Sequence, residues 1–244
     1  MQLSKAVLVL VDISGYTKFV VLHRISVLHA EGIITELIEA VAAEARVPLR
    51  LNKLEGDAAL FVAPFEGETG PALDDVYDQV ACFFEAFRQK RAEIFEASVG
   101  GCICTACQSV EHLELKAIVH VDEIVLKQVG GFEEVAGRGV ILLHRLLKNT
   151  VPYDEYLLVT KEADAERAAE VFPSREPHVE DVDDLGRVDC AIYRPLVLAL
   201  ERPAVRPLTR PRGLWAALKI SWAWLMARLR GQRRSFGNLP TEEA

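Results

Sequence analysis

The sequence lacks any long apolar run. No stretch of about 18 uncharged apolar residues occurs in its 244 residues, which argues against a simple membrane-spanning helix. The apolar run at residues 6–11 is short and is followed at once by Asp12, so we interpret it as a buried strand and not as the core of a signal peptide. We therefore expect a cytoplasmic protein.

Cysteine is sparse and odd in number. Five cysteines without a recognisable secretion signal favour a reducing compartment and argue against a disulfide framework. Three of them, Cys102, Cys104 and Cys107, fall close together, with His112 behind them. Thiolates and an imidazole can form a tetrahedral Zn²⁺ site, but the spacing lacks a second cysteine pair, and reduced cysteines packed as small apolar residues are the alternative.

Basic residues are also sparse in most of the chain. The formal net charge is −8, and residues 201–244 hold nine Arg or Lys against three Glu, which is +6, so residues 1–200 carry −14. An acidic body of this kind argues against nucleic acid as the main partner.

What the chain does contain is an apolar fraction of 50%, enough to bury a sizeable core. Residues 1–200 alternate between strand and helix patterns and are predicted to form one domain. Strand patterns cover residues 6–11, 50–53, 58–62, 113–121, 124–129, 156–160 and 190–193, and helical patterns cover residues 30–45, 72–96, 139–148 and 163–171. Hairpin turns are predicted at Glu55-Gly56 and Asp122-Glu123. Helices segregated between hairpins predict an α+β fold, a mostly antiparallel sheet backed by helices.

The amino-acid composition changes at Glu201. Residues 201–212 are rich in proline and arginine and are predicted to be an extended linker. Residues 213–230 repeat tryptophan and leucine at helical spacing between arginines, which predicts an amphipathic helix lying on an anionic membrane surface. A helix packed on the acidic body or on a protein partner is the alternative. Residues 231–244 are predicted to be disordered.

Two motifs each place an aspartate between an apolar strand and a glycine turn. Asp12 lies in VDISGYTKF and Asp57 lies in NKLEGDAALF. A carboxylate in such a position is costly unless it is solvated, hydrogen-bonded or bound to metal. Two carboxylates on neighbouring strand ends can hold hard divalent cations, which activate a hydroxyl and bridge phosphate oxygens. Helix capping by Asp12 and turn stabilisation by Asp57 explain the spacing equally well.

These motifs resemble a known family. DISGYTKF and KLEGDAALF are similar to the two metal motifs of class III adenylate and guanylate cyclases, and three later stretches follow in the family's order: LKAIVHVDEIVLKQVG, EEVAGRGVILLHRLLKN and DLGRVDCAIYRP. The resemblance covers about residues 5–195 and is closest to a divergent bacterial branch. It implies a ferredoxin-like, cyclase-type sheet.

The resemblance also implies a role for each matching residue. The implied site holds two Mg²⁺ or Mn²⁺ ions and a nucleoside triphosphate, with ATP favoured. By position, the metal ligands are Asp12 and Asp57, the adenine-reading pair is Lys53 and Glu134, the transition-state arginine is Arg145, and the cation for the terminal phosphates is Arg187. In the family, the site forms between two chains, so the resemblance implies a homodimer and the conversion of ATP to cyclic AMP and pyrophosphate.

One position departs from the family pattern. Ile141 stands where the family has an asparagine four residues before the arginine, and isoleucine cannot orient the ribose or its hydroxyl. A binding module that keeps the fold as a nucleotide or metal sensor, without turnover, is therefore the alternative. A purely structural role for both aspartates is a third reading. His120 and His144 are each more simply explained as packed or surface residues.

Overall fold

The computed structural model describes residues 1–22, 27–67, 69–101 and 109–195. Cys102, Cys104 and Cys107 lie outside these residues, as do the predicted linker, amphipathic helix and C-terminal tail of residues 201–244. In the part of the chain that the structure describes, no helix is both long and apolar enough to cross a membrane.

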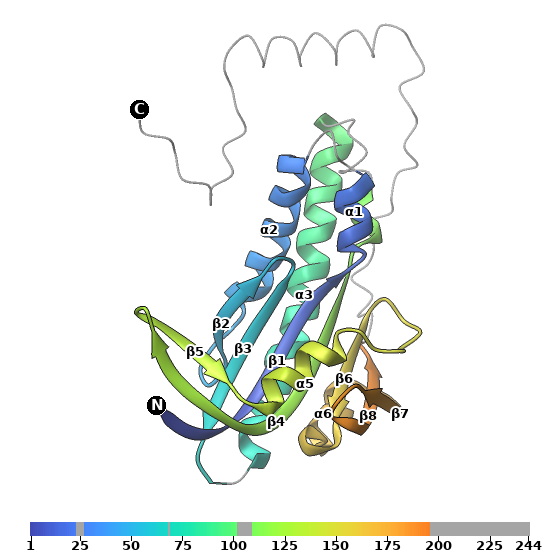
Figure 1. The fold of residues 1–244 in the computed structure, drawn as a ribbon. Coiled ribbons are helices and arrows are strands. Elements are labelled where there is room, and N and C mark those ends of the chain that lie inside the picture. Colours follow the sequence, from blue (N-terminus) through green and yellow to red (C-terminus); the bar gives the residue numbers. More distant parts are fainter. Residues whose placement is uncertain (23–26, 68, 102–108, 196–244) are drawn as a thin grey trace, which may run out of the picture.

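A single mixed sheet forms the centre of the molecule (Figure 1). The strands are β1 (Gln2–Ser14), β2 (Arg50–Glu55), β3 (Ala58–Phe65), β4 (Glu114–Val129), β5 (Phe132–Ala136), β6 (Tyr156–Thr160), β7 (Ser174–Val182) and β8 (Gly186–Arg194). Their order is β2-β3-β1-β4-β6-β8-β7, and β5 pairs with β4 outside this path. Only the β4–β6 pair is parallel among these pairings, so the mostly antiparallel α+β fold is confirmed.

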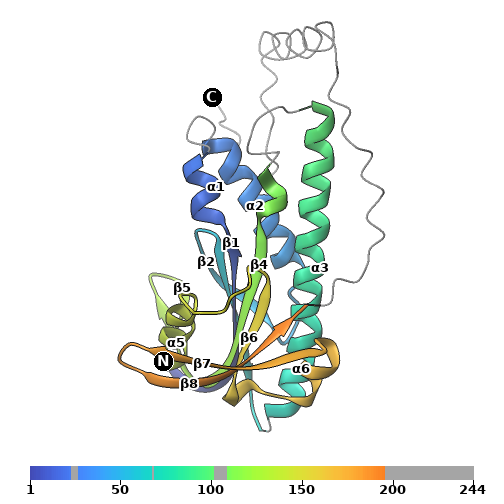
Figure 2. The same cartoon turned by 90° about the vertical axis from the view of Figure 1, so that its right-hand side faces the viewer.

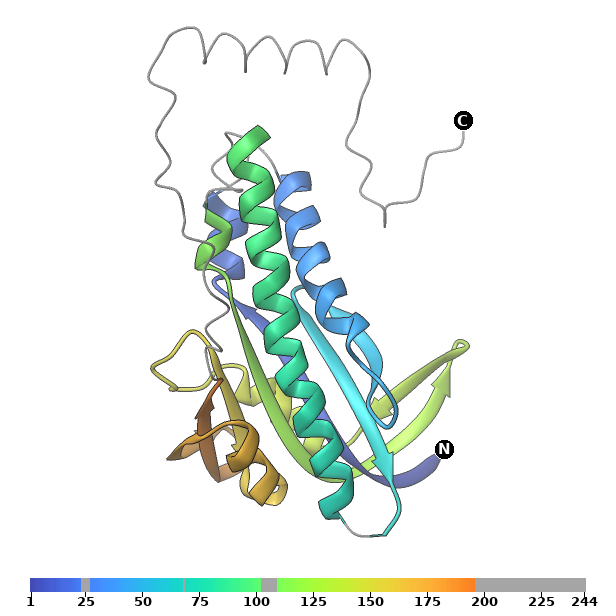
Figure 3. The same ribbon diagram turned by 180° about the vertical axis from the view of Figure 1, so that it is seen from behind.

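Helices cover both faces of the sheet. α1 (Tyr16–Leu22), α2 (Val27–Ala43) and the long α3 (Thr69–Gly101) lie on one side, as Figure 3 shows, and α5 (Arg138–Leu146) lies on the other, facing the viewer in Figure 1. Figure 2 shows α3 running from beside α6 (Glu166–Val171) to beyond α1. Short 3₁₀ turns, η2 (Val110–His112) and η3 (Lys161–Ala163), precede β4 and follow β6.

Strand β1 shows why both faces need cover. Val7, Val9 and Val11 pack into the core under α2 and α3, while Ala6, Leu8 and Leu10 pack into the core under α5. All six side chains are fully buried. Successive side chains of a strand point to opposite faces, so a continuous apolar run is the pattern of a strand covered on both sides.

The second predicted hairpin turn was wrong. β4 runs without a break from Glu114 to Val129, and the chain turns instead at Gly130-Gly131, where φ is +58° and +86°. Asp122 and Glu123 are paired residues of the strand, opposite Ala6 and Lys5 of β1. The opposite charges of Lys5 and Glu123 face one another across the ladder, which favours the strand at this point. The resulting β4–β5 hairpin projects from the sheet (Figure 1).

Strand β7 was not predicted. Its side chains alternate between exposed and partly buried up to Val179, and only Glu180 and Val182 are buried. β7 is an edge strand that pairs with β8 along its whole length, and it therefore needs no apolar run of its own.

Candidate functional site

Asp12 and Asp57 meet at one edge of the sheet. Asp12 is directly opposite Ala58 in the β1–β3 ladder, and Asp57 immediately precedes Ala58 at the turn of the β2–β3 hairpin. Burial raises the pKa of the Asp57 carboxyl to about 7, and the charge of Asp12 and a hydrogen bond with its side chain add to that effect. The two carboxylates therefore repel one another when both are ionised, and a bound cation would relieve that repulsion.

The carboxylate pair fits a divalent cation. Its ligand atoms are oxygens, which Mg²⁺ and Mn²⁺ prefer, and the pKa of one carboxyl is raised first by burial and then by the charge of the other, which a metal would offset. Among residues 1–22, 27–67, 69–101 and 109–195, no group of three or more His, Cys, Asp or Glu side chains is arranged to hold a metal ion. A cation at this edge would therefore need further ligands from water or substrate, as is usual for Mg²⁺.

Lys116 is a third charged group at this edge, and its role was not predicted from the sequence. Its Nζ lies 2.8 Å from Oδ2 of Asp12, and the two side chains are only 17% and 15% exposed. The same ammonium donates a hydrogen bond to the carbonyl oxygen of Leu147, at 3.3 Å, just beyond the end of α5. Lys116 thus joins the carboxylate pair on the sheet to the helix that carries Arg145.

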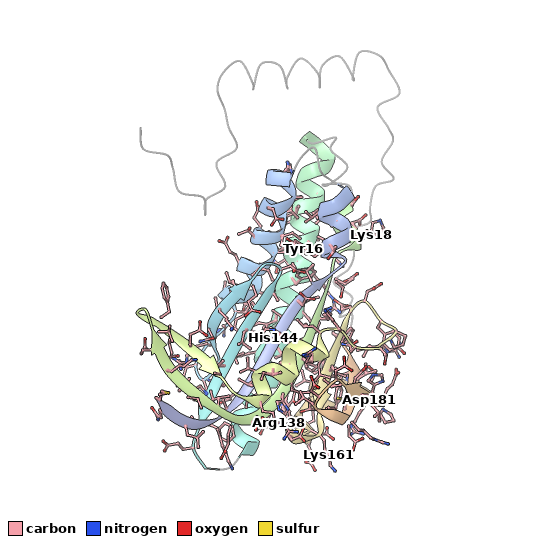
Figure 4. All side chains as sticks on the ribbon, viewed as in Figure 1. Tyr16, Lys18, Arg138, His144, Lys161 and Asp181 are labelled. Atoms are coloured by element: carbon pink, nitrogen blue, oxygen red, sulfur yellow. The ribbon has the colours of Figure 1, made fainter. Side chains whose placement is uncertain are left out.

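Lys53 lies on β2 and faces Glu55 on the same strand. The Nζ of Lys53 is 3.0 Å from Oε1 of Glu55, and Oε2 of Glu55 is 3.4 Å from Nδ1 of His144 on α5. Figure 4 shows His144 on the helix in front of the sheet. His144 was interpreted from the sequence as a packed or surface residue, and its contact with Glu55 was not predicted.

Glu134 lies on β5, beside β2. Its neighbour Glu133 forms an ion pair with Arg50 at 2.7 Å and accepts a hydrogen bond on its carbonyl oxygen from Asn52 Nδ2 at 3.3 Å. Asn52 occupies the register shift between Leu51 and Lys53, and such a bulge changes the direction of the side chain that follows. Strands β2 and β5 thus approach one another without pairing, and within the described residues the ion pair of Lys53 is with Glu55 and not with Glu134.

The two arginines lie near one corner of the molecule. Arg145 is exposed on α5 and lines a pocket of about 130 Å³ with Lys148, Asn149 and residues 180–183 of β7 and its turn. Asp181, labelled in Figure 4, lines the same pocket and is the cross-strand partner of Arg187. Arg187 is 73% exposed and lies 3.1 Å from Asp189. The side chains of Arg145 and Arg187 can therefore both reach an anionic ligand without leaving a buried ion pair.

Ile141 shares an exposed face of α5 with Arg145, one turn away. Its side chain is 56% exposed, so it plays no part in the core. His120, by contrast, is a packed residue: its Nδ1 is 2.8 Å from Thr160 Oγ1, and burial lowers the pKa of its imidazole. Gly139 is required where α5 meets β4, because a β-carbon there would lie 2.7 Å from the Cβ of Asp122.

The predicted cysteine and histidine site lies mostly outside the described residues. His112 ends η2 and is exposed. The two cysteines that the structure describes, Cys82 and Cys190, are free thiols. Burial raises the pKa of the Cys190 thiol to about 12, which makes it a poor nucleophile.

Solved structures with the same fold are known. The guanylate cyclase domain of RhGC from Catenaria anguillulae in complex with GTP superposes with a TM-score of 0.55 at 15% identity, covering 80% of this chain and 99% of that one. The adenylyl cyclase CyaB from P. aeruginosa superposes with a TM-score of 0.52 at 13% identity, covering 80% and 96%. The chain therefore has the fold of class III nucleotidyl cyclase domains.

Sequence comparison identifies nearer relatives. The "Uncharacterized protein Rv2561/Rv2562" of Mycobacterium tuberculosis (strain ATCC 25618 / H37Rv) is 33% identical over 213 residues, which cover 85% of this chain and 97% of that protein. A family profile described as "Protein of unknown function (DUF2652)" matches residues 34–156, from within α2 to the start of β6. The chain therefore belongs to the DUF2652 family, and its fold is that of the class III cyclase domains.

Proposed function

We propose that this protein is a nucleotidyl cyclase that converts ATP to cyclic AMP and pyrophosphate in a site formed between two copies of the chain. The observation that carries the proposal is the meeting of Asp12 and Asp57 at one sheet edge, where burial and mutual charge raise the pKa of Asp57. Such a pair is unfavourable in a purely structural role and is suited to bind a cation.

In this proposal, Asp12 and Asp57 would hold two Mg²⁺ or Mn²⁺ ions, whose positive charge would offset the negative charge of the triphosphate and lower the pKa of the ribose 3′-hydroxyl. The 3′-hydroxyl loses its proton to solvent, its oxygen forms a bond to the α-phosphorus, and the bond from that phosphorus to the bridging oxygen of pyrophosphate breaks. Arg145 and Arg187 neutralise the charge that develops on the α-phosphate and on the leaving pyrophosphate. Lys53 and Glu134 orient the base.

Exposed apolar side chains support the proposal that a second copy of the chain completes the site. Five of them lie on the elements that carry the base and phosphate residues, namely Leu51 and Leu54 on β2, Val129 and Phe132 at the tip of the β4–β5 hairpin, and Ile141 on α5. Phe132 is 76% exposed. Apolar side chains exposed on the elements that carry site residues are typical of a surface that another chain covers.

The second candidate is a sensor or scaffold that binds nucleotide or metal without turnover. Ile141 favours it, because its exposed apolar side chain stands where the cyclases have an asparagine. This side chain cannot hydrogen-bond the ribose, so the 3′-hydroxyl would lack an orienting group.

One experiment separates the two candidates. Full-length protein is incubated with each of the four ribonucleoside triphosphates and Mn²⁺ or Mg²⁺, and cyclic products are identified by mass spectrometry. A cyclic nucleotide that disappears in Asp57→Ala, but not in the surface control Asp78→Ala, supports the enzyme. Metal-dependent binding of ATP without a product supports the sensor. Absence of both binding and product contradicts both candidates.

A further inference from the structure

The pocket at the end of α5 is lined by two elements that are far apart in the sequence. Arg145 lines it from the last turn of the helix, and Glu180 lines it from the edge strand β7. Most side chains of β7 are exposed or partly buried, whereas that of Glu180 is only 7% exposed. A carboxylate buried to this extent is costly unless it is hydrogen-bonded, so its hydrogen-bond partners indicate what the residue does.

Glu180 is hydrogen-bonded to the segment that follows α5. Its Oε1 accepts hydrogen bonds from the backbone N–H of Thr150, at 2.6 Å, and from the hydroxyl of Thr150, at 2.9 Å. Nε2 of His178 lies 2.6 Å from the same oxygen. Burial raises the pKa of Glu180, but the hydrogen bonds from His178 and Thr150 lower it by more, so the group is a carboxylate at neutral pH. Glu180 therefore joins β7 to the chain that leaves the helix.

The last turn of α5 is attached to the sheet by the residue before Thr150. The side-chain amide of Asn149 donates hydrogen bonds to the carbonyl oxygen of Leu146, at 2.7 Å, and to the hydroxyl of Tyr156 on β6, at 2.6 Å. The last carbonyl groups of a helix have no partners within it, so a contact of this kind fixes where the helix ends. Asn149 thus ties the end of α5 to the middle of the sheet, and Glu180 ties the next residue to its edge.

We propose that Glu180 is a positioning residue, which holds the helix end so that Arg145 meets the phosphate groups of the substrate. This inference rests on the proposed function, in which Arg145 neutralises the charge that develops on the α-phosphate. Glu180 itself carries a negative charge and would repel a phosphate, so it acts through the helix end and not by contact with the substrate. The side chain of Arg145 is exposed, and the position of its backbone therefore decides which part of the pocket its guanidinium can reach.

The test measures kcat and KM of full-length protein for ATP in Mn²⁺, from the formation of cyclic AMP. Arg145→Ala should lower kcat about a hundredfold, because one charged donor to the transition state is lost. Glu180→Ala should lower kcat about tenfold with little change in KM, because a small displacement of Arg145 slows the reaction while ground-state binding is kept. In the Arg145→Ala background, Glu180→Ala should have no further effect on kcat, since residues that act as one unit are not additive.

Two further variants separate positioning from a general attachment of β7. Glu180→Gln keeps a side-chain oxygen that can accept hydrogen bonds from Thr150, and it should restore most of the kcat that Glu180→Ala loses. Glu176→Ala is the matched control. Glu176 lies on the same strand and accepts a hydrogen bond from the hydroxyl of Tyr153, in the same segment, at 3.0 Å, but it does not line the pocket. Its removal should leave kcat at the wild-type value.

Circular dichroism checks that each variant is folded. If Glu180→Ala is not, Thr150→Ala carries the test. This change removes the hydroxyl contact with Glu180 and keeps the backbone one. It should lower kcat while Arg145 is present and should have no effect in the Arg145→Ala background.

The outcomes separate the two proposals. If the wild type forms no cyclic nucleotide, the proposed function is overturned and this inference with it. If Arg145→Ala keeps the wild-type kcat, the role of Arg145 in the proposed function is wrong, and the inference falls with that role. If Arg145→Ala is slow but Glu180→Ala changes only KM, or lowers kcat by the same factor in both backgrounds, only this inference is overturned. An equal loss of kcat in Glu176→Ala has the same consequence.

Discussion

Lys116 and Asp12 face one another directly across the β1–β4 ladder, and their charged atoms are 2.8 Å apart in a largely buried position. The carboxylate pair is therefore partly neutralised before any metal binds. Lys116 opposes the rise in the pKa of Asp57 for the same reason. Several measurable properties of the protein depend on this arrangement.

Replacing Lys116 by methionine should destabilise the metal-free protein by about 3 kcal/mol, because it leaves a largely buried carboxylate without its partner. Urea denaturation at pH 7 in the presence of a chelator measures the change. Lys90→Met is the control, and the exposed pair of Lys90 with Glu93 should contribute less than about 1 kcal/mol. Equal losses in the two variants would show that Lys116 acts only as a surface charge. Added Mn²⁺ should restore more stability to Lys116→Met than to the wild type.

The metal-free protein should lose stability between about pH 4 and pH 7. The pKa of Asp57 is raised from 3.8 to about 7, so the folded state holds a proton that the unfolded state releases, and stability falls as pH rises through this window. Asp57→Asn removes the effect. Thermal unfolding in a chelator should therefore show a gain for the variant over the wild type that is larger at pH 8 than at pH 5. A gain that is constant with pH would contradict the raised pKa.

Divalent cations should bind more tightly as pH rises toward 7. A cation competes with the proton on Asp57, so protons are released on binding. Titration calorimetry with Mn²⁺ in two buffers of different ionisation enthalpy, at pH 6 and pH 8, measures the released protons. More should be released at pH 6, where the carboxyl is still protonated. Asp57→Asn should release none.

Ile141→Asn should increase turnover if the enzyme is active, by about tenfold or more, because the amide can orient the ribose hydroxyl. The side chain is 56% exposed, so the change should alter stability by less than about 0.5 kcal/mol. Rates of cyclic AMP formation under saturating ATP and Mn²⁺ measure the effect. Ile141→Val serves as the control. A rate unchanged in both variants would show that another feature limits the chemistry.

Residues 213–230, outside the described structure, are predicted to attach the protein to anionic membranes. Full-length protein should sediment with vesicles that contain phosphatidylserine, and deletion of these residues should abolish that binding. Vesicles of phosphatidylcholine alone provide the control. A truncated protein that still sediments with anionic vesicles would place the binding surface elsewhere on the chain.

Buried strands were the part of the fold that the sequence predicted best. The run at residues 6–11 could only be accommodated by a sheet covered on both faces, and β1 is such a strand. Strand β7 was missed because an edge strand can be polar along most of its length. The turn at Asp122-Glu123 was misplaced because an acidic pair within a strand resembles a turn until its partner Lys5 is known.

The candidate site was predicted only in part, for a similar reason. Asp12 and Asp57 stand out locally, since each follows or precedes an apolar strand beside a glycine. Lys116 has no such signal, because its contact with Asp12 depends on the register of β1 against β4. Glu55 and His144 lie on separate elements, β2 and α5, and their contact appears only when the helix is packed on the sheet.

The β2–β3 hairpin carries Lys53 and Glu55 on one strand and Asp57 at its turn, two residues beyond Glu55. In a two-fold dimer of the proposed kind, these residues would serve different nucleotides. Two substitutions in the same hairpin, each on a different chain, would then affect the same site and leave the other site of the dimer intact. Asp57→Ala and Lys53→Ala proteins, each inactive alone, should recover about a quarter of the wild-type sites when mixed and allowed to exchange subunits, since each mixed dimer contains one undamaged site.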